Sequence, residues 1–203
     1  MGGRFITFEG IDGSGKSTQA RALAARLRAG GAEVVETREP GGSPGAEAVR
    51  RLLVEGDTDR WSPETEILLF TAARRDHLER TIAPALDRGA TVVCDRYVDS
   101  TRVYQGVARA DLRRMVDALH TEAIGLEADL TLIVDLDPDD GLARGRARGG
   151  AEDRFERLGA EFQARLRLGF LALAAEFPGR CRVVSGAGTA AEVAERVAAE
   201  VAR

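Results

Sequence analysis

The residues of clearest chemical purpose lie near the N-terminus, where residues 10–17 have the sequence Gly-Ile-Asp-Gly-Ser-Gly-Lys-Ser. This segment fits the pattern GxxxxGK(S/T), in which glycines let successive backbone amides curl around a phosphate. Lys16 would bridge the terminal phosphates, and the Ser17 hydroxyl would ligate Mg²⁺. The alternative is a glycine-rich turn that matches by chance. The pattern predicts an ATP-type triphosphate site formed by Gly10, Ile11, Asp12, Gly13, Ser14, Gly15, Lys16, Ser17 and Thr18.

Lys16 is the single lysine of the 203-residue chain, which has 28 arginines and no asparagine. A coding bias explains the excess of arginine and says nothing about function. The same bias should have replaced Lys16, unless its site needs a compact ammonium group. The absence of asparagine excludes the Asn-Lys-x-Asp motif by which many GTPases recognise guanine.

A second polar group follows the apolar run at residues 92–94, which ends abruptly in Asp95 and Arg96. An acid at the end of a buried strand can hold the Mg²⁺ shell, directly or through water, and Arg96 would then face a phosphate. The alternative is a surface ion pair at a strand end. We therefore take Lys16, Asp95 and Arg96 as candidate catalytic residues and Ser17 and Asp95 as candidate Mg²⁺ ligands.

Two further segments are suited to a second ligand. Residues 37–42, Thr-Arg-Glu-Pro-Gly-Gly, form a turn in which proline and glycine shape the backbone beside Arg38. Phe70 and Arg74 are four residues apart and share a helix face, which suits stacking on a nucleobase and hydrogen bonds to its carbonyl oxygens. Taken alone, this pair favours a simpler arrangement with Phe70 in the core and Arg74 in solvent.

Two more segments complete the candidate site. Residues 95–106 contain both tyrosines and many hydrogen-bonding side chains, which is typical of a pocket wall. Residues 144–150 contain three glycines and three arginines, and charged residues continue beyond them. We expect a mobile, cationic lid over a triphosphate at about residues 144–156, with a solvated arginine-rich loop as the alternative.

A framework of strands and helices must position these segments. Short β-rich runs at residues 4–9, 33–37, 91–95, 130–136 and 182–185 predict five strands. Apolar residues spaced three or four apart predict helices between them, including a long stripe from Phe155 to Phe177. The alternation implies one α/β domain over residues 1–203, with a five-stranded parallel sheet flanked by helices. Ligands of such sheets bind at the carboxyl ends of the strands.

Composition narrows the classes of function. A net charge of −4 without a long basic tract argues against a nucleic-acid polymer as ligand. The N-terminus is too short and polar for a signal sequence, and the apolar runs fall far short of the roughly 20 residues that cross a bilayer. Cys94 and Cys181 lie in apolar runs and indicate a reducing compartment. We expect a cytoplasmic protein without a membrane partner.

These motifs together resemble those of bacterial thymidylate kinases. The resemblance rests on the P-loop block at residues 9–18, the Thr-Arg-Glu-Pro-Gly-Gly block at 37–42, and Asp-Arg-Tyr at 95–97 followed by Ser-Thr at 100–101 and Tyr-Gln-Gly at 104–106. The first block occurs in many P-loop proteins, whereas the others together are specific. The resemblance implies a P-loop nucleotide-kinase fold that transfers the γ-phosphoryl group of ATP to dTMP with Mg²⁺, usually as a cytoplasmic homodimer.

The resemblance also implies roles for individual residues. Arg38 and Arg96 would grip the dTMP phosphate, Phe70 would stack on thymine, and Arg74 would donate to its O4 atom. Tyr104 would crowd the ribose 2′ position and favour deoxyribose. The implied substrate-binding residues are Asp12, Arg38, Arg50, Phe70, Arg74, Arg96, Ser100, Thr101, Tyr104 and Gln105.

Five other positions complete this set of expectations. Asp12 would lie near the sugar and Mg²⁺, and Arg50 is a weaker candidate for a phosphate contact. Thr101 and Gln105 would line the base. Val103 stands where the family usually has alanine, and its extra methyl groups would tighten the pocket wall.

The P-loop at residues 11–14 contains no arginine. Family members of this kind supply a charge-stabilising arginine from the lid, and Arg148 is the first candidate for that catalytic role. Arg144, Arg146 and Arg154 are its candidate companions in ATP binding. An arginine inserted in this way is worth about 10³ to 10⁵ in rate.

Two other functions remain open at this stage. One is a deoxynucleoside kinase, whose acceptor carries no phosphate and leaves Arg38 and Arg96 without an anion to bind. The other is a switch-type ATPase that uses nucleotide to drive partner binding.

A few residues remain unassigned. Trp61, His77 and His120 are expected to be isolated, without a ligand cluster. The C-terminal helix has valines spaced four apart at residues 193, 197 and 201, which suits packing on its own sheet or on a second subunit equally well.

Overall fold

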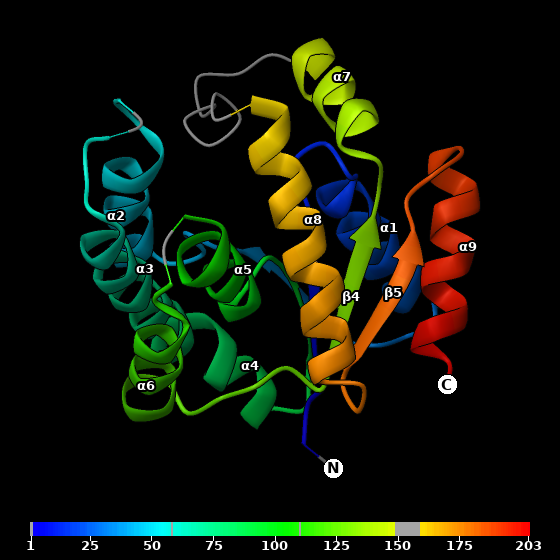
Figure 1. Ribbon diagram of the computed structural model, residues 1–203. Coiled ribbons are helices and arrows are strands. Elements are labelled where there is room, and N and C mark those ends of the chain that lie inside the picture. Colours follow the sequence, from blue (N-terminus) through cyan, green and yellow to red (C-terminus); the bar gives the residue numbers. More distant parts are fainter. Residues whose placement is uncertain (1, 58, 110, 149–158) are drawn as a thin grey trace.

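The computed structural model describes residues 2–57, 59–109, 111–148 and 159–203. Within these residues one sheet has the strand order β2-β3-β1-β4-β5, and each neighbouring pair is parallel (Figure 1). The strands are β1 (Phe5–Glu9), β2 (Val34–Arg38), β3 (Thr91–Asp95), β4 (Leu130–Asp135) and β5 (Cys181–Ser185). The five predicted strands are therefore confirmed, with boundaries that differ by at most one residue.

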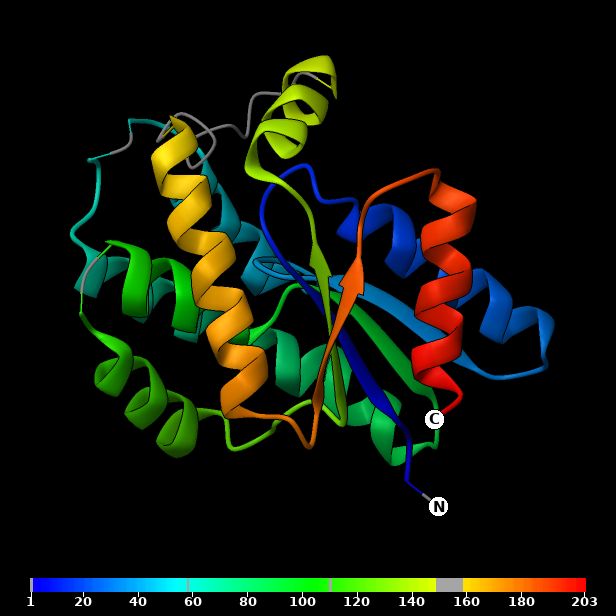
Figure 2. The ribbon, with the colours of Figure 1, turned by 45° about the vertical axis from the view of Figure 1, so that its right-hand side comes forward.

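Helices cover both faces of this sheet. They are α1 (Lys16–Ala29), α2 (Pro44–Val54), α3 (Pro63–His77), α4 (Ala83–Asp87), α5 (Val98–Val103), α6 (Arg113–Ala123), α7 (Pro138–Arg148), α8 (Gly159–Glu176) and α9 (Ala190–Val201), with π-helical turns η1 (Leu78–Ile82) and η2 (Tyr104–Arg109). Helices α1 and α9 lie on one face, and α3 to α6 with α8 lie on the other (Figure 2). The α/β architecture agrees with the expected parallel sheet flanked by helices.

Several helix starts are specified locally. Ser43 and Ser62 precede Pro44 and Pro63, and each serine side chain accepts a hydrogen bond from the third residue of the following helix. Serine caps an unpaired backbone donor, and proline suits the first turn because its missing N–H would have no helical partner. These caps set the starts of α2 and α3, the two helices beside the cleft described below.

The core follows the alternation of side chains along the strands. Ile6 and Phe8 of β1 pack against α1 and α9, whereas Phe5 packs on the opposite side with Val92 and Cys94. Two buried layers result, one on each face of the sheet. Burial leaves both cysteines as free thiols and raises the pKa of each, to about 12 for Cys181.

The C-terminal helix packs on its own sheet. Val193 and Val197 are buried against β4 and β5, and Val201 packs at the edge of the same cluster. Of the two arrangements that the valine spacing allowed, these three side chains therefore adopt packing on their own sheet and not on a second subunit.

Helix α8 confirms most of the predicted apolar stripe. Phe162, Leu166, Phe170 and Leu173 are buried, whereas Phe155 and Leu158 lie outside the described residues. The expectation for Val103 is wrong, because its side chain does not line the cleft. It packs in the core beneath α8, where Gly169 leaves room for its methyl groups.

Among the described residues, the helices are too short or too polar to traverse a lipid bilayer.

Candidate active site

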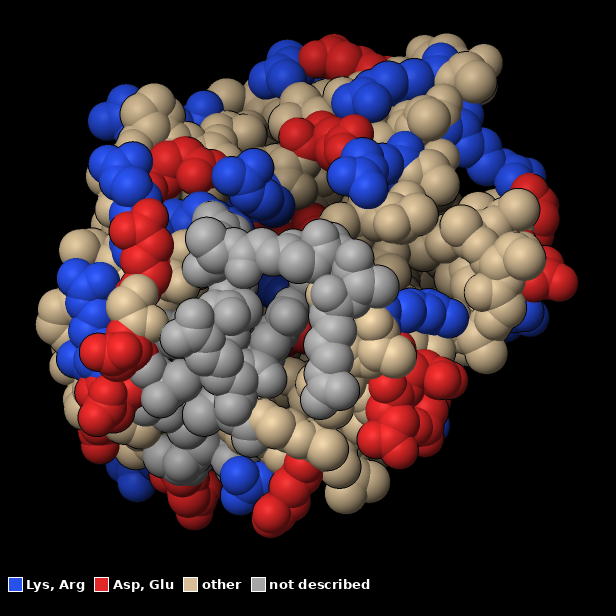
Figure 3. All heavy atoms as spheres, turned by 90° about the horizontal axis from the view of Figure 1, so that it is seen from above, with Lys and Arg blue, Asp and Glu red and all other residues tan. Residues whose placement is uncertain are grey.

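A cleft of about 980 Å³ lies at the carboxyl edge of the sheet. Its walls come from the loop between β1 and α1, the ends of β2 and β3, helices α2, α3 and α5, and the loop between β5 and α9. Figure 3 views this end of the molecule, where Lys and Arg side chains are interleaved with Asp and Glu around the rim. The polar segments singled out from the sequence thus converge at one place.

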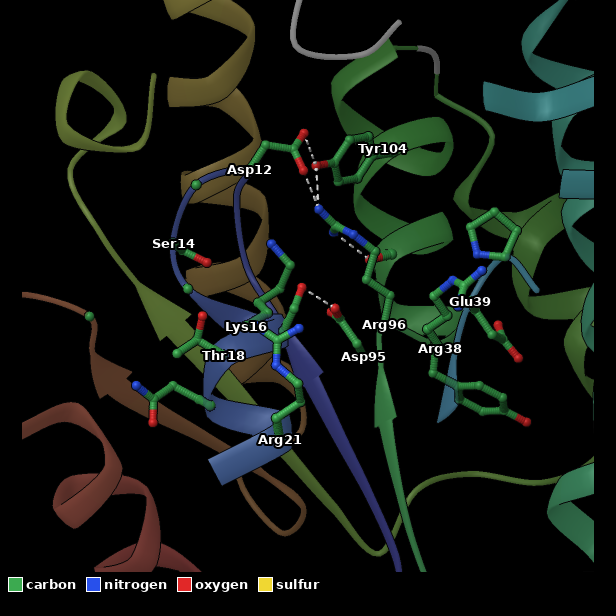
Figure 4. Close-up of a pocket in the computed structure, with 18 of the residues that line it drawn as sticks. Asp12, Ser14, Lys16, Thr18, Arg21, Arg38, Glu39, Asp95, Arg96 and Tyr104 are labelled. Atoms are coloured by element: carbon green, nitrogen blue, oxygen red, sulfur yellow. Dashed lines mark hydrogen bonds and ion pairs between the residues drawn. The ribbon is translucent and has the colours of Figure 1, made fainter. Parts of the chain in front are cut away.

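Lys16 lies beside the loop between β1 and α1 (Figure 4). Its side chain is buried, and Nζ donates a 2.6 Å hydrogen bond to the Ile11 carbonyl oxygen. Gly13 and Gly15 adopt positive φ angles of 76° and 99°, which bend the chain around the ammonium group. Burial, followed by the charge of Arg96, lowers the pKa of Lys16 to about 8. An anion at this loop would restore the full charge of the lysine.

Ser17 and Asp95 form the candidate cation site. The Ser17 hydroxyl donates to Asp95 Oδ2, so the start of α1 meets the end of β3. The second oxygen, Asp95 Oδ1, is buried and has no hydrogen-bond partner within the described residues. A hydroxyl and a carboxylate with a spare lone pair are ligands that Mg²⁺ prefers. The donor set therefore fits the expected ion.

Arg96 connects the loop between β1 and α1 to the opposite wall. Its Nη1 atom donates to the Gly10 carbonyl at 3.2 Å and to Ser100 Oγ at 2.9 Å. Its Nη2 atom donates to Asp12 Oδ1 and, at 3.2 Å, to the Tyr104 hydroxyl. Figure 4 shows the guanidinium between Asp12 and the start of α5. The alternative of an exposed surface pair at the strand end is thereby excluded.

This pairing controls the protonation of Asp12. Burial alone would raise the pKa of Asp12, but the charges of Arg96 and Lys16 outweigh it and hold that pKa below its ordinary value. The Tyr104 hydroxyl also donates to Asp12, at 2.9 Å. Gln163 of α8, which the sequence did not single out, further stabilises the carboxylate. The cleft therefore keeps Asp12 as an anion.

Glu9 was not among the predicted site residues. It holds in place the segment that directly follows Arg96. Its carboxylate accepts hydrogen bonds from the Tyr97 amide at 2.8 Å, the Ser100 amide at 3.2 Å and the Ser100 hydroxyl at 2.5 Å. It thus caps α5 from a different strand. Arg96 has a φ of 69°, a conformation that a non-glycine residue adopts only where its surroundings hold it. Burial, followed by the nearby Asp99, raises the pKa of Glu9 to about 7.

Arg38 and Arg50 lie along the far wall of the cleft. The Arg38 side chain is 53% exposed, and its Nη2 atom donates to Glu47 at 3.0 Å. Arg50 donates to the Pro40 carbonyl oxygen, which ties α2 to the turn after β2. Gly41 and Gly42 of this turn have φ angles of 129° and 86°, as the glycine pair led us to expect. A phosphate would have to share Arg38 with Glu47.

The end of the cleft beyond Arg96 has the groups expected to face a base. Phe70 is half-buried and lines the cleft together with Thr101. Arg74 is only 2% exposed, so the arrangement with Arg74 in solvent is wrong. Gln105 Nε2 donates to Glu66 at 3.0 Å, whereas its Oε1 atom has no hydrogen-bond partner in the described part of the chain.

His77 is not isolated as expected. It is fully buried and bonds to both Thr37 and Glu39. The sequence contains one indication of this role, because His77 follows Arg74 by three residues and so shares its helix face.

The other two residues expected to be isolated also have neighbours. Trp61 donates to the Leu52 carbonyl oxygen, and His120 lies 3.2 Å from Glu127. Within the residues that the structure covers, no cluster of three or more His, Cys, Asp and Glu side chains is arranged to hold a metal ion.

The opposite end of the cleft is lined by Arg144 and the loop after β5. Arg144 donates to the Gly186 carbonyl at 3.3 Å, and Gln19 donates to the Ala190 carbonyl at 3.0 Å. The start of the expected lid is therefore helical and belongs to α7. The side chains of Arg146 and Arg148, together with the whole of Arg154, lie outside the described residues.

Comparisons with known proteins agree with this geometry. Residues 8–197 match the family model described as thymidylate kinase. A thymidylate kinase of Ruegeria pomeroyi is 66% identical over 91% of this chain and 87% of its own length. One from Dinoroseobacter shibae is 63% identical over 98% and 96%. The crystal structure of thymidylate kinase from Ehrlichia chaffeensis matches with a TM-score of 0.79 at 36% identity, over 99% of both chains.

Proposed function

This chain belongs to the thymidylate kinase family, and from that premise we propose how its cleft is divided between two nucleotides. The chain phosphorylates dTMP to dTDP and uses ATP as the phosphoryl donor. In our proposal the triphosphate of ATP lies on the P-loop, residues 10–18, and dTMP occupies the end of the cleft near Phe70 and Arg74. The two phosphate groups meet beside Arg96.

Catalysis in this arrangement depends on charge and position. The transition state spreads negative charge over the γ-phosphoryl oxygens, so fixed positive groups stabilise it more than they stabilise the substrates. Lys16 supplies one such charge from the donor side, and Arg96 supplies another from between the two ligands. Because the Lys16 side chain is buried, the Arg96 side chain is mostly buried, and both are hydrogen-bonded, little reorganisation is needed during transfer.

The polar groups at the far end are complementary to thymine. Thymine presents an N3–H donor beside the O4 acceptor. Gln105 Oε1 supports this assignment as an acceptor without a partner among the described residues, and Arg74 brings guanidinium donors to the same end of the cleft. Cytosine presents an acceptor and a donor at these positions, so both contacts would be reversed. We assign Phe70 to stacking on the ring and Tyr104 to exclusion of a ribose 2′-hydroxyl.

Ser17 and Asp95 would hold Mg²⁺. The unpartnered Asp95 Oδ1 supports this assignment, because a buried carboxylate oxygen otherwise pairs with a donor. When bound, the ion would neutralise charge that develops on the transferred phosphoryl group. The chain's part is to keep a hydroxyl and a carboxylate oriented toward one point, through the contact between α1 and β3.

The lid is proposed to complete the site. Arg148 is the first candidate for the arginine that reaches the γ-phosphoryl group, with Arg144, Arg146 and Arg154 as companions on ATP. Arg144 lines the cleft near the loop after β5, which supports a position beside the donor nucleotide. Closure would also exclude water, which otherwise accepts the phosphoryl group.

We also propose a cytoplasmic homodimer. The two buried free thiols suit a reducing compartment. Leu52 of α2 and Leu68 of α3 are large exposed apolar side chains on two helices that pack together, and they are candidates for the contact between subunits. Sedimentation equilibrium should give twice the mass of the chain, and Leu68→Glu should shift it toward the monomer.

The observation that carries the proposal is the position of Arg96 between the P-loop and the far wall. Such a guanidinium has a role only if the acceptor is already anionic. A coupled ADP-release assay with ATP and Mg²⁺ tests this with dTMP, with thymidine and without acceptor. We expect turnover with dTMP only. Turnover of thymidine in place of dTMP would favour a deoxynucleoside kinase, and an ATPase rate indifferent to dTMP would favour a switch protein.

A further inference from the structure

A buried chain of polar contacts runs beneath the base end of the cleft. The Thr37 hydroxyl lies 2.7 Å from His77 Nε2, and His77 Nδ1 lies 3.0 Å from Glu39 Oε1. Arg74 Nε donates to Glu39 Oε2 at 2.7 Å, and Arg74 Nη2 donates to the Thr101 hydroxyl at 3.0 Å. The contacts join β2, α3 and α5. His77, Glu39 and Arg74 have almost no exposed surface.

The chemistry of each group fixes the direction of these hydrogen bonds. An ionised carboxylate only accepts, so Glu39 takes the Nε–H of Arg74 on one oxygen and the Nδ1–H of His77 on the other. In the neutral imidazole Nε2 is then an acceptor, and the Thr37 hydroxyl donates to it. The negative charge of Glu39 is matched by Arg74, as a buried ion pair requires.

The contact with Glu39 orients Arg74. The central carbon of the Arg74 guanidinium also lies 5.2 Å from the centroid of the Tyr97 ring, and this contact limits how far the guanidinium can move toward the ring. With Nε and Nη2 engaged, Nη1 has no hydrogen-bond partner among the described residues and belongs to a side chain that lines the cleft. A rotation of the Glu39 carboxylate would move or break the charge-assisted Nε hydrogen bond that holds the planar guanidinium in this position.

His77 prevents that rotation and also supports the turn that carries Glu39. A side-chain carbon added at Gly42 would collide with both the imidazole and the Thr37 hydroxyl, so the turn lies directly against them. The Thr81 hydroxyl secures the same turn with a 2.8 Å hydrogen bond to the Gly42 carbonyl. The imidazole therefore contacts both Glu39 and the turn that follows it.

We propose that His77, acting through Glu39, is a positioning residue that aims Arg74 at the edge of the acceptor base and so sets the preference for thymine over cytosine. The inference rests on the proposed function, in which Arg74 reads that edge. His77 itself does not line the cleft, so its influence on specificity reaches the base only through the carboxylate.

The test compares three substitutions of His77 in the full-length enzyme. His77→Asn keeps an amide donor close to the place of Nδ1, His77→Gln moves the amide toward the place of Nε2, and His77→Leu removes both nitrogens. Steady-state kcat and KM are measured with dTMP and with dCMP at saturating ATP. We expect His77→Leu and His77→Gln to raise the KM for dTMP roughly 10- to 100-fold and to lower the dTMP-to-dCMP ratio of kcat/KM by a similar factor.

His77→Asn should restore both values to within a few-fold of the parent, and the KM for ATP should change less than twofold in all three variants. A merely structural role would instead make Asn and Gln equally impaired, with kcat and both KM values affected together. Thr37→Val provides a matched control, because it removes the outer hydrogen bond and leaves the contact with Glu39 intact. Should His77→Leu fail to fold, the comparison of Asn with Gln decides the question.

Arg74→Gln separates this inference from the proposed function. If that variant leaves the dTMP-to-dCMP ratio at the parental value, Arg74 does not read the base and the assignment on which the inference rests is wrong. If Arg74→Gln lowers the ratio while His77→Gln matches His77→Asn, the base assignment stands and the positioning role of His77 is overturned.

Discussion

The two ends of the cleft are built in different ways. The end that we assign to the donor nucleotide is built mainly on one segment, residues 10–18, whose glycines adopt positive φ angles. The end that we assign to the acceptor is assembled from side chains that come from the region of β2, from α3 and from α5 and are separated by tens of residues. The first kind of site is specified locally, whereas the second depends on buried polar contacts.

This difference has consequences for the effects of mutations. Changes at the donor end should lower the rate with every acceptor, because they remove charge from the transferred phosphoryl group. Changes at the acceptor end should act on the choice and binding of the acceptor. Arg96 and its support Glu9 lie between the two ends, so their loss should affect both. The predictions below test this division, beginning with the largest expected effect.

Lys16→Ala should lower kcat about 10⁴-fold, because a charge on the terminal phosphates is lost at the transition state. The fold should persist, since the side chain contributes one hydrogen bond, to Ile11. Lys16→Arg is the matched control, and we expect it to be impaired as well, because a guanidinium does not fit the closely wrapped loop. Rates are measured with dTMP, and melting temperatures report the fold. A fully active Lys16→Arg variant would show that any cation suffices there.

Arg148→Ala should lower kcat about 10³-fold and should change the KM for dTMP little, because its contact forms mainly at the transition state. Arg144→Ala is the comparison, since that side chain lines the donor end and bonds to Gly186. It should mainly raise the KM for ATP. If both variants turn over at the parental rate, the catalytic arginine lies elsewhere in the lid.

Arg96→Lys should lower kcat/KM for dTMP about 10²-fold. A single ammonium group is unable to reach Gly10, Asp12 and Tyr104 together, as the guanidinium does. Arg102→Lys in α5 provides a nearby control, because Arg102 is buried and ion-paired to Asp99 away from the cleft. That variant should lose stability with a much smaller change in KM. Equal changes in KM for the two variants would remove the special role of Arg96.

Glu9→Gln should change the pH dependence of stability. The pKa of Glu9 is about 7 in the folded protein, above its ordinary value of 4.5. Proton binding by Glu9 therefore contributes about 3 kcal/mol to the free energy of unfolding below pH 4.5, and this contribution is lost as the pH rises to 7. Urea titrations between pH 4.5 and 7.5 should therefore give diverging free energies of unfolding for the parent and the variant. Parallel curves would mean that Glu9 titrates at its ordinary pKa.

The position of residues 10–18 in the cleft is the part of the site that the sequence predicts most completely. Its residues are contiguous, and each glycine or lysine reports a local requirement that does not depend on distant partners. The strands were located for a similar reason, because runs such as Thr91–Asp95 carry their own apolar signal. The single lysine added a compositional signal that the structure explains by its burial in the loop.

The buried carboxylates and the imidazole that hold Arg96 and Arg74 in place could not be inferred in the same way. Glu9 and Glu39 belong to recognised motifs, but nothing local indicates that their carboxylates turn inward to cap α5 and to hold Arg74. His77 was set aside because its partners lie 38 and 40 residues away in sequence. Val103 was misjudged, since only the three-dimensional packing shows that Gly169 of α8 accommodates it.

A crystal structure with dTMP and a non-hydrolysable ATP analogue tests the central claim most directly. The account predicts a triphosphate wrapped by the amides of residues 10–18 and a separate phosphate within hydrogen-bonding distance of Arg96, with the thymine ring over Phe70. A dTMP phosphate found away from both Arg96 and Arg38, or a single nucleotide filling the whole cleft, would contradict it.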